Sequence, residues 1–161
     1  MARALIVGCG CHGRELGSAL LDAEWAVRGT SRTSAGVAAI EAAGIEGAEA
    51  DPDRLGTVLD LIDDVTAIVW LMGSASGSEE AVAAANGDRL ESLMIRLVDT
   101  PVRGFVYEGV GSAPSGVLRR GAGIVEDAAE RWRIPVRILR EERGRDGWTD
   151  ATAEAVRSAI G

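Results

Sequence analysis

The chain has 161 residues, of which 47% are hydrophobic, and its formal net charge is −8. This length predicts one domain, residues 1–161, with a sizeable core. The acidic balance disfavours a nucleic-acid partner, which would need a basic face. No apolar run is long enough to span a membrane. Because Met1 leads directly into the first expected strand, we expect no signal peptide and a cytoplasmic protein.

Apolar runs alternate with helical patterns along the whole chain. We expect strands at Arg3–Val7, Trp25–Arg28, Ile45–Ala50, Thr66–Met72, Gly104–Tyr107 and Val136–Leu139. We expect helices at Cys11–Asp22, Ser34–Ala43, from Asp53 to about Ile62, Ser78–Val98 with a break at Asn86-Gly87, Val117–Trp132 and Thr149–Ile160. Such alternation predicts an α/β Rossmann-type fold. Its doubly wound parallel sheet would have about six strands in the order 3-2-1-4-5-6, with helices on both faces.

The first expected strand runs into the pattern Gly8-x-Gly10-x-x-Gly13, and a helical pattern follows at once. Gly8 permits a tight turn, Gly10 lets a pyrophosphate approach the backbone, and Gly13 lets the helix pack close to the strand. The N–H groups that open the helix then face the phosphates. The strand, turn and helix context favours dinucleotide binding over a glycine-rich turn that binds nothing.

Ligands of such sheets bind beyond the carboxyl ends of the strands, where the strand order reverses. The glycine turn should therefore share a crevice with the turns at Thr30–Arg32, Met72–Ser74 and Glu108–Ser112. The predicted cofactor-binding residues are Gly8, Gly10, Cys11, His12, Gly13, Thr30, Ser31, Arg32, Asp51, Met72, Gly73 and Ser74.

The end of the second strand favours NADP over NAD. An NAD site usually has an acid there to bind the ribose 2′-hydroxyl, whereas this segment has none and ends in Arg32. A guanidinium suits a 2′-phosphate. Alternatively, Arg28, Thr30 or Ser31 distinguishes NADP from NAD, and Arg32 points to solvent. Asp51 either reaches the adenine of the cofactor or caps the helix that ends at about Ile62, and Asp53 is the competing cap of that helix. For the helix at Ser34–Ala43, Ser34 is the expected cap.

A metal site is not expected. Cys9, Cys11 and His12 lie together, but a structural zinc normally needs four ligands, and His12 is the only histidine. The chain also contains no lysine, because all 17 basic residues are arginine. This excludes a Schiff base and a lysine-assisted proton relay.

The sequence resembles the short-chain dehydrogenase/reductase superfamily, within it the atypical, NmrA-like NAD(P)-binding group. The resemblance rests on Gly8-x-Gly10-x-x-Gly13 with Gly17, on Gly29-Thr30-Ser31-Arg32, on Phe105-Val106-Tyr107 before a Gly/Ser loop, and on the segment Ile134–Arg140. It covers nearly the whole chain and implies the same fold and a nicotinamide dinucleotide cofactor.

The catalytic pair of that superfamily, Tyr-x-x-x-Lys, is missing. The only tyrosine is Tyr107, with Gly111 four residues later, and the substrate-binding extension of larger members is expected to be missing. One interpretation is a cofactor-binding protein without hydride chemistry, for example a redox sensor or a regulatory partner of another protein. The other is a minimal NADPH-dependent oxidoreductase or epimerase-like enzyme with an unknown small-molecule substrate. Its weak catalytic candidates are Glu108, Tyr107 and Ser112, although the sequence favours Glu108 as a solvated loop carboxylate over Glu108 as an acid or base.

Two apolar stripes could form a homodimer interface or merely cover the sheet. Their residues are Leu90, Leu93, Met94 and Leu97 in one helix, and Val117, Leu118, Ile124, Val125 and Ala128 in the other.

Overall fold

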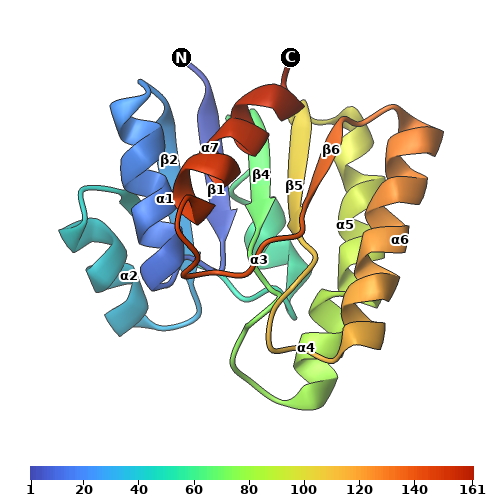
Figure 1. Cartoon of the computed structure of the whole chain (residues 1–161). Helices are drawn as coiled ribbons and strands as arrows, with labels where there is room; N and C mark the ends of the chain where they lie inside the picture. The colour runs from blue at the N-terminus through green and yellow to red at the C-terminus, as the bar shows by residue number, and fades with distance from the viewer.

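Six parallel strands form one sheet in the order β3-β2-β1-β4-β5-β6, which confirms the predicted fold. The computed structural model describes all residues, 1–161. The strands are β1 (Arg3–Val7), β2 (Ala26–Ser31), β3 (Glu46–Glu49), β4 (Ala67–Trp70), β5 (Gly104–Glu108) and β6 (Val136–Leu139). Their carboxyl ends all point to one edge of the sheet, at the bottom of Figure 1, while both chain termini lie at the top.

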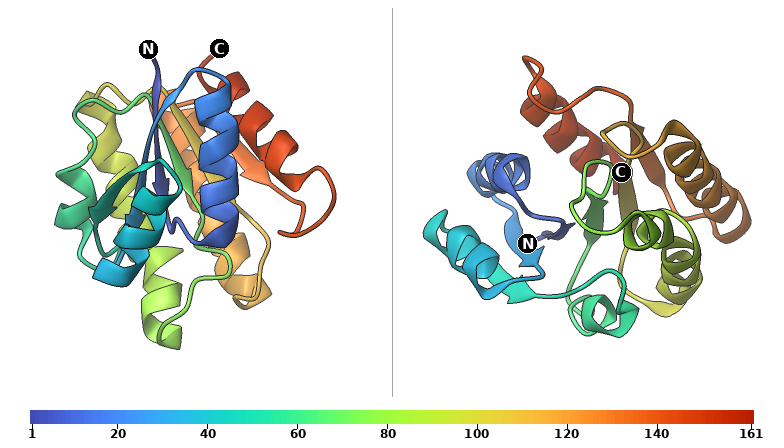
Figure 2. Two further views of the ribbon diagram at one scale, coloured as in Figure 1. Left: turned by 90° about the vertical axis from the view of Figure 1, so that its left-hand side faces the viewer. Right: turned by 90° about the horizontal axis from the view of Figure 1, so that it is seen from below.

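Helices cover both faces of this sheet. They are α1 (Cys11–Asp22), α2 (Ser34–Ala42), α3 (Leu55–Leu59), α4 (Glu79–Ala85), α5 (Asp88–Arg96), a short 3₁₀ turn η1 (Leu97–Asp99), α6 (Ser115–Trp132) and α7 (Trp148–Ala159). Helices α1, α2 and α7 pack on one face, and α3, α4, α5 and α6 pack on the other. Figure 2 shows the sheet between the two helix layers. No helix is both long and apolar enough to cross a bilayer.

The central strand β4 is buried on both faces. Ile68 and Trp70 face the α5–α6 side, whereas Ala67 and Val69 face the α1–α7 side. Successive strand side chains alternate between faces, so an apolar run without polar alternation is suited to a strand covered twice. This explains why β4 was recognisable as an unbroken apolar segment.

The apolar stripes considered for a dimer cover the sheet. Six members of these stripes are at most 5% exposed: Leu90, Leu93, Met94, Leu97, Leu118 and Val125. All of them except Leu118 belong to one core with residues of β4 and β5. Their burial within a single chain therefore accounts for the pattern.

The break at Asn86-Gly87 separates α4 from α5 as expected, and Asn86 is buried at the break. The Asn86 side-chain amide donates to the Met72 carbonyl at 3.2 Å and the Val82 carbonyl at 3.0 Å. Its oxygen accepts a 2.8 Å hydrogen bond from the Tyr107 hydroxyl. Asn86 thus joins the ends of β4 and β5 to α4 through one buried amide.

Four local predictions were wrong, two of them in β2 and α2 and two in α3. Strand β2 continues to Ser31, because it pairs with β3 as far as Ser31 opposite Glu49. Thr33, not Ser34, caps α2 by accepting the Gly36 N–H at 3.0 Å.

The predicted cap of α3 was also wrong, since its N-cap is Arg54 and no side chain caps it. The Asp51 carboxylate instead accepts the Asp53 N–H at 3.0 Å, in a turn before the helix. The helix also ends at Leu59, before the expected Ile62.

Candidate functional site

A crevice of about 330 Å³ lies at the carboxyl edge of the sheet. Five chain regions line it: the glycine turn after β1 with the start of α1, the end of β2 with the start of α2, the residues after β3, the loop after β4, and the loop between β6 and α7. Strand order reverses between β1 and β4, so the crevice lies where ligands of this sheet type bind.

The glycine turn leaves the start of α1 open toward the crevice. Gly8 has a φ of +84°, and a Cβ there would lie 2.6 Å from the Leu71 carbonyl oxygen. Gly10 is the N-cap of α1 and offers no side-chain cap to the first N–H groups. A Cβ on Gly10 would meet no atom within 4 Å. The turn therefore presents unsatisfied N–H groups and empty space, which suits an anion.

The end of β2 lies beside this turn. The Cys9 N–H donates to the Thr30 carbonyl at 3.0 Å. Arg32 reaches across the crevice, where its Nη2 donates to the Ser76 carbonyl at 2.9 Å and to the Ser76 hydroxyl at 3.2 Å. Arg32 is thus positioned at the crevice, with its charge unpaired by any carboxylate.

Arg28, the alternative residue for binding a 2′-phosphate, forms ion pairs outside the crevice. Its guanidinium pairs with Glu46 and with Asp64 and donates to the Leu61 carbonyl at 2.8 Å. The hydrogen bonds that Arg28 donates to Asp64 and, to a smaller extent, to Glu46 raise its pKa further above its usual value. It does not line the crevice.

Glu108 is fully buried at the end of β5 and was not recognised as part of an ion pair. It accepts the Gly73 N–H at 2.8 Å. Arg143, from the loop before α7, donates to both its carboxylate oxygens, with Nε at 2.6 Å from Oε2 and Nη2 at 2.8 Å from Oε1. The interpretation of Glu108 as a solvated loop carboxylate is therefore wrong, because no part of its side chain is exposed.

The charged residues that line the crevice are all basic. Arg14 comes from α1, Arg32 follows β2, and Arg143 comes from the loop between β6 and α7. No aspartate or glutamate lines the crevice, although the chain carries a net charge of −8. Glu108 compensates the charge of Arg143, whereas Arg14 and Arg32 form no ion pair, so the site is suited to an anionic ligand.

Many of the predicted cofactor residues come together in this crevice. Those that line it are Gly8, Gly10, Thr30, Ser31, Arg32, Met72 and Ser74. Those that do not line it are Cys11, His12, Gly13, Asp51 and Gly73. Gly13 packs under the turn instead, since a Cβ there would lie 3.3 Å from the Cys9 sulfur and 3.4 Å from the Gly8 carbonyl oxygen.

Sequence reasoning missed Arg14 and Arg143 as lining residues. Arg14 follows the glycine pattern directly, so its position on the first turns of the helix was a usable signal. Arg143 lies in a charged loop more than thirty residues from any other lining segment, and no sequence pattern marks it.

The candidate catalytic residues are not arranged for proton transfer in the crevice. Tyr107 is fully buried, and burial raises the pKa of its hydroxyl, with a smaller contribution from Glu108. That hydroxyl is bonded to Asn86 beneath α6. Ser112 is exposed, and its backbone N–H donates to the Ser74 hydroxyl at 3.0 Å.

The two cysteines and the histidine form no shared site. Cys9 is buried, and burial raises the pKa of its thiol to about 11, so it is an inert packing residue. Cys11 is exposed. The His12 ring packs instead against Trp148 of α7, with ring centroids 5.8 Å apart.

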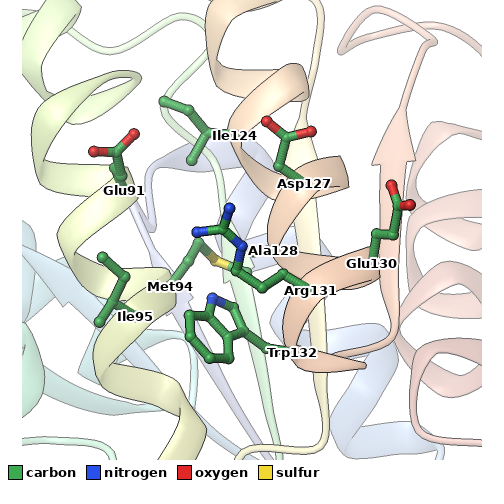
Figure 3. Close-up of a pocket in the computed structure, with 9 residues that line it drawn as sticks. All are labelled: Glu91, Met94, Ile95, Ile124, Asp127, Ala128, Glu130, Arg131 and Trp132. Atoms are coloured by element: carbon green, nitrogen blue, oxygen red, sulfur yellow. The ribbon is translucent and has the colours of Figure 1, made fainter.

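A second and larger cavity, of about 790 Å³, lies on the surface between α5 and α6. Figure 3 shows Glu91, Met94 and Ile95 of α5 facing residues of α6 across it. The Arg131 and Trp132 side chains extend from the end of α6 into the space between the two helices. This cavity is remote from the glycine turn, because none of its lining residues lines the crevice.

No family model matches the sequence. No curated protein matches it either. The fold, by contrast, matches solved structures at low sequence identity. UDP-glucuronic acid 4-epimerase from Bacillus cereus in complex with NAD has a TM-score of 0.67 and 16% identity, over 86% of this chain and 56% of that one. Over the matched residues the chain has the same fold as that enzyme.

Two reductases share this fold. Vestitone reductase from alfalfa has a TM-score of 0.65 and 20% identity, over 86% of this chain and 56% of that one. Yeast methylglyoxal/isovaleraldehyde reductase complexed with NADPH has a TM-score of 0.63 and 11% identity, over 86% of this chain and 53% of that one. The chain therefore spans about half the length of the solved structures it matches.

Proposed function

We propose that this protein binds NADP(H) in the crevice at the carboxyl edge of its sheet. The observation that carries the proposal is the combination of the open Gly10 turn with lining arginines and no lining carboxylate. NADP bears a 2′-phosphate and a pyrophosphate, whereas NAD lacks the 2′-phosphate. A basic crevice without an acid after β2 therefore favours NADP. The matched folds include a structure in complex with NAD and one complexed with NADPH, which supports a nicotinamide dinucleotide but does not choose between the two.

The residues present fit such a cofactor. Gly10 leaves the space that a pyrophosphate would fill, and the start of α1 supplies N–H donors. Arg32 follows β2, at the place where the adenosine ribose of a dinucleotide binds in this fold. A bound nicotinamide supplies hydride chemistry when a substrate and a proton donor accompany it.

We further propose that cofactor binding, and not hydride transfer through a tyrosine–lysine pair, is the principal property of this chain. Tyr107 is buried against Asn86, Glu108 is paired with Arg143, and the sequence contains no lysine. We then expect a regulatory protein partner to recognise the cofactor-bound form of this chain. The alternative, a minimal oxidoreductase or epimerase-like enzyme, would have to use other acid and base groups.

Titration of the purified protein with NADPH and NADH tests the proposal, and Gly10→Val is the decisive variant. Its side chain would enter the empty space of the turn without a clash, because no atom lies within 4 Å of the new Cβ. We expect the variant to fold and to lose NADPH affinity by at least about tenfold, since the pyrophosphate can no longer approach the backbone.

Gly123→Val in α6 is the matched control, because its Cβ is equally uncrowded and lies outside the crevice. Unchanged NADPH affinity in a folded Gly10→Val protein would contradict the proposal. A scan of carbonyl and quinone substrates for NADPH consumption separates the two interpretations. Turnover would favour the oxidoreductase, and its absence with tight binding would favour the binding protein.

A further inference from the structure

Arg143 is a charged side chain fixed in place inside the crevice. It comes from the loop between β6 and α7 and lies beside the turn formed by Gly8 and Gly10. Its side chain is 22% exposed, whereas that of Arg140 in the same loop is 72% exposed. The guanidinium therefore lies in the wall of the crevice, in contact with its open space.

Two neighbours hold this guanidinium rigidly. Glu108 accepts from Nε and Nη2, and the Leu71 carbonyl accepts from Nη2 at 3.0 Å. Glu108 is itself fixed by the Gly73 N–H. The Leu71 carbonyl oxygen also lies within 2.6 Å of the position of a Cβ on Gly8. Arg143 is thus bound to the ends of β4 and β5 and placed directly next to the glycine turn.

The remaining edge of Arg143 has no partner within the protein. A guanidinium carries five N–H donors in a fixed fork, and the hydrogen bonds of Arg143 use those on Nε and Nη2 only. Both N–H groups of Nη1 are left for a ligand. A rigid arginine with a free edge loses little conformational entropy when it binds, and its planar fork suits an oxyanion.

We propose that Arg143 binds an oxyanion of the crevice ligand, and that Glu108 is the positioning residue that aims it. The proposal rests on the proposed function insofar as the ligand is a dinucleotide. The oxyanion then belongs either to the cofactor pyrophosphate or to the carboxylate or phosphate of a second ligand. In both cases Glu108 acts only through Arg143 and touches no ligand.

The test compares wild type, Arg143→Met and Arg140→Met by calorimetric titration with inorganic pyrophosphate, NADPH and 2′,5′-ADP. We expect Arg143→Met to weaken pyrophosphate binding by about tenfold to a hundredfold, as loss of a charge-assisted hydrogen bond implies. Arg140→Met should match wild type, because it removes the same charge from the same loop outside the crevice. 2′,5′-ADP carries a single 5′-phosphate in place of the pyrophosphate, so its affinity should fall by a smaller factor than that of pyrophosphate, whereas structural damage would weaken both alike.

The two sources of the oxyanion give different results. If Arg143 binds the pyrophosphate of the cofactor, Arg143→Met weakens NADPH and NADH by equal factors. If it binds a second ligand, both cofactor affinities survive, and oxalate binding to the NADPH-loaded protein is lost. Either result supports the proposal. Unchanged affinity for pyrophosphate, both cofactors and oxalate in a folded variant would overturn it.

Arg143→Met leaves the buried Glu108 carboxylate unpaired, which endangers folding. The double variant Glu108→Gln/Arg143→Met removes both charges and gives a second measurement of the same loss. Glu108→Gln alone keeps the Arg143 charge but loosens its position, so we expect an intermediate loss of pyrophosphate affinity with a smaller loss for 2′,5′-ADP. A wild type that binds pyrophosphate but not NADPH would overturn the proposed cofactor, while loss in Arg143→Met would still support the oxyanion role.

Discussion

Arg32 is the residue on which the choice between NADP and NAD depends most. It is exposed at the end of β2, and its hydrogen bonds go to Ser76, whose hydroxyl and carbonyl are neutral groups. The competing Arg28 is held by Glu46 and Asp64. A 2′-phosphate would therefore compete only with weak, uncharged partners for the Arg32 guanidinium.

We expect Arg32→Ala to weaken NADPH binding and to change NADH binding little. A charge-assisted contact contributes about 1.5–3 kcal/mol, which corresponds to a loss of roughly tenfold to over a hundredfold. Since Arg32 is exposed, added salt should also reduce the NADPH preference of the wild type. Dissociation constants for both cofactors, in wild type and variant, check this. Equal losses for both, or none for either, would show that Arg32 does not read the 2′-phosphate.

At the scale of elements, one ion-pair network joins the strands β1, β2 and β3 to the turn before β4. Arg28 pairs with Glu46 and Asp64, and Arg3 pairs with the same two carboxylates at 3.4 Å and 3.2 Å. The hydrogen bond from Arg28 lowers the pKa of Asp64 below its ordinary value of 3.8. The network thus links three strands through two arginines.

This network predicts part of the acid sensitivity of the fold. Because the pKa of Asp64 is lower in the folded state, its stabilisation is present above the unfolded-state pKa and is lost as the pH falls through the folded-state value. Asp64 is half exposed, so we expect Asp64→Asn to cost only about 0.5–1 kcal/mol at neutral pH. The cost should vanish at pH values below both pKa values.

Urea unfolding of wild type, Asp64→Asn and Asp63→Asn across acidic and neutral pH measures this difference. Asp63 is the matched control, since it is an exposed neighbour without an ion pair. An Asp64→Asn curve that runs parallel to wild type at all pH values would show that the network contributes no pH-dependent stability.

The sequence predicted the order of the elements well and their ends less well. Strand β4 and the Asn86-Gly87 break were recognisable, because burial on both faces and a helix breaker leave local patterns. The end of β2 was missed because its last residues are held by pairing with β3, which is a tertiary interaction. The cap of α2 was misplaced by one residue, since Thr33 and Ser34 are equally suitable by type.

The same difference between local and distant interactions applies to the candidate site. The glycine turn is a local motif, so Gly8 and Gly10 could be identified from their spacing. The environment of Glu108 depends on Arg143, which is 35 residues away in a loop without a motif. In the sequence, Glu108 follows the expected strand directly, which suggested a solvated loop carboxylate. Only the folded structure shows that Glu108 forms a buried ion pair with Arg143.

At the scale of the whole molecule, the surface between α5 and α6 carries exposed apolar side chains. Ile95, Val98 and Trp132 are 54%, 44% and 40% exposed, and Ile95 and Trp132 line the 790 Å³ cavity. Exposed apolar residues gathered around a cavity are typical of interaction surfaces. The buried stripes of both helices cannot serve this purpose, because they cover the sheet.

We expect a second copy of the chain to cover this face. A two-fold axis through it would pack α5 and α6 against themselves, and it would bring the Arg131 guanidinium of one copy toward the acidic residues that flank the cavity of the other. Glu91, Asp127 and Glu130 provide those carboxylates. Apolar anchors with complementary charges around them are the usual composition of such an interface.

Light scattering at several concentrations tests this expectation directly. The wild type should approach twice the mass of one chain as its concentration rises, and Ile95→Asp should remain at the mass of one chain, because the new carboxylate would be buried without a partner. Ser18→Asp on α1, exposed on the other face of the sheet, is the control and should associate like wild type. NADPH affinity should be the same in all three proteins, since Ile95 lies outside the crevice. A wild type that stays at the mass of one chain at every concentration would end the expectation of a homodimer.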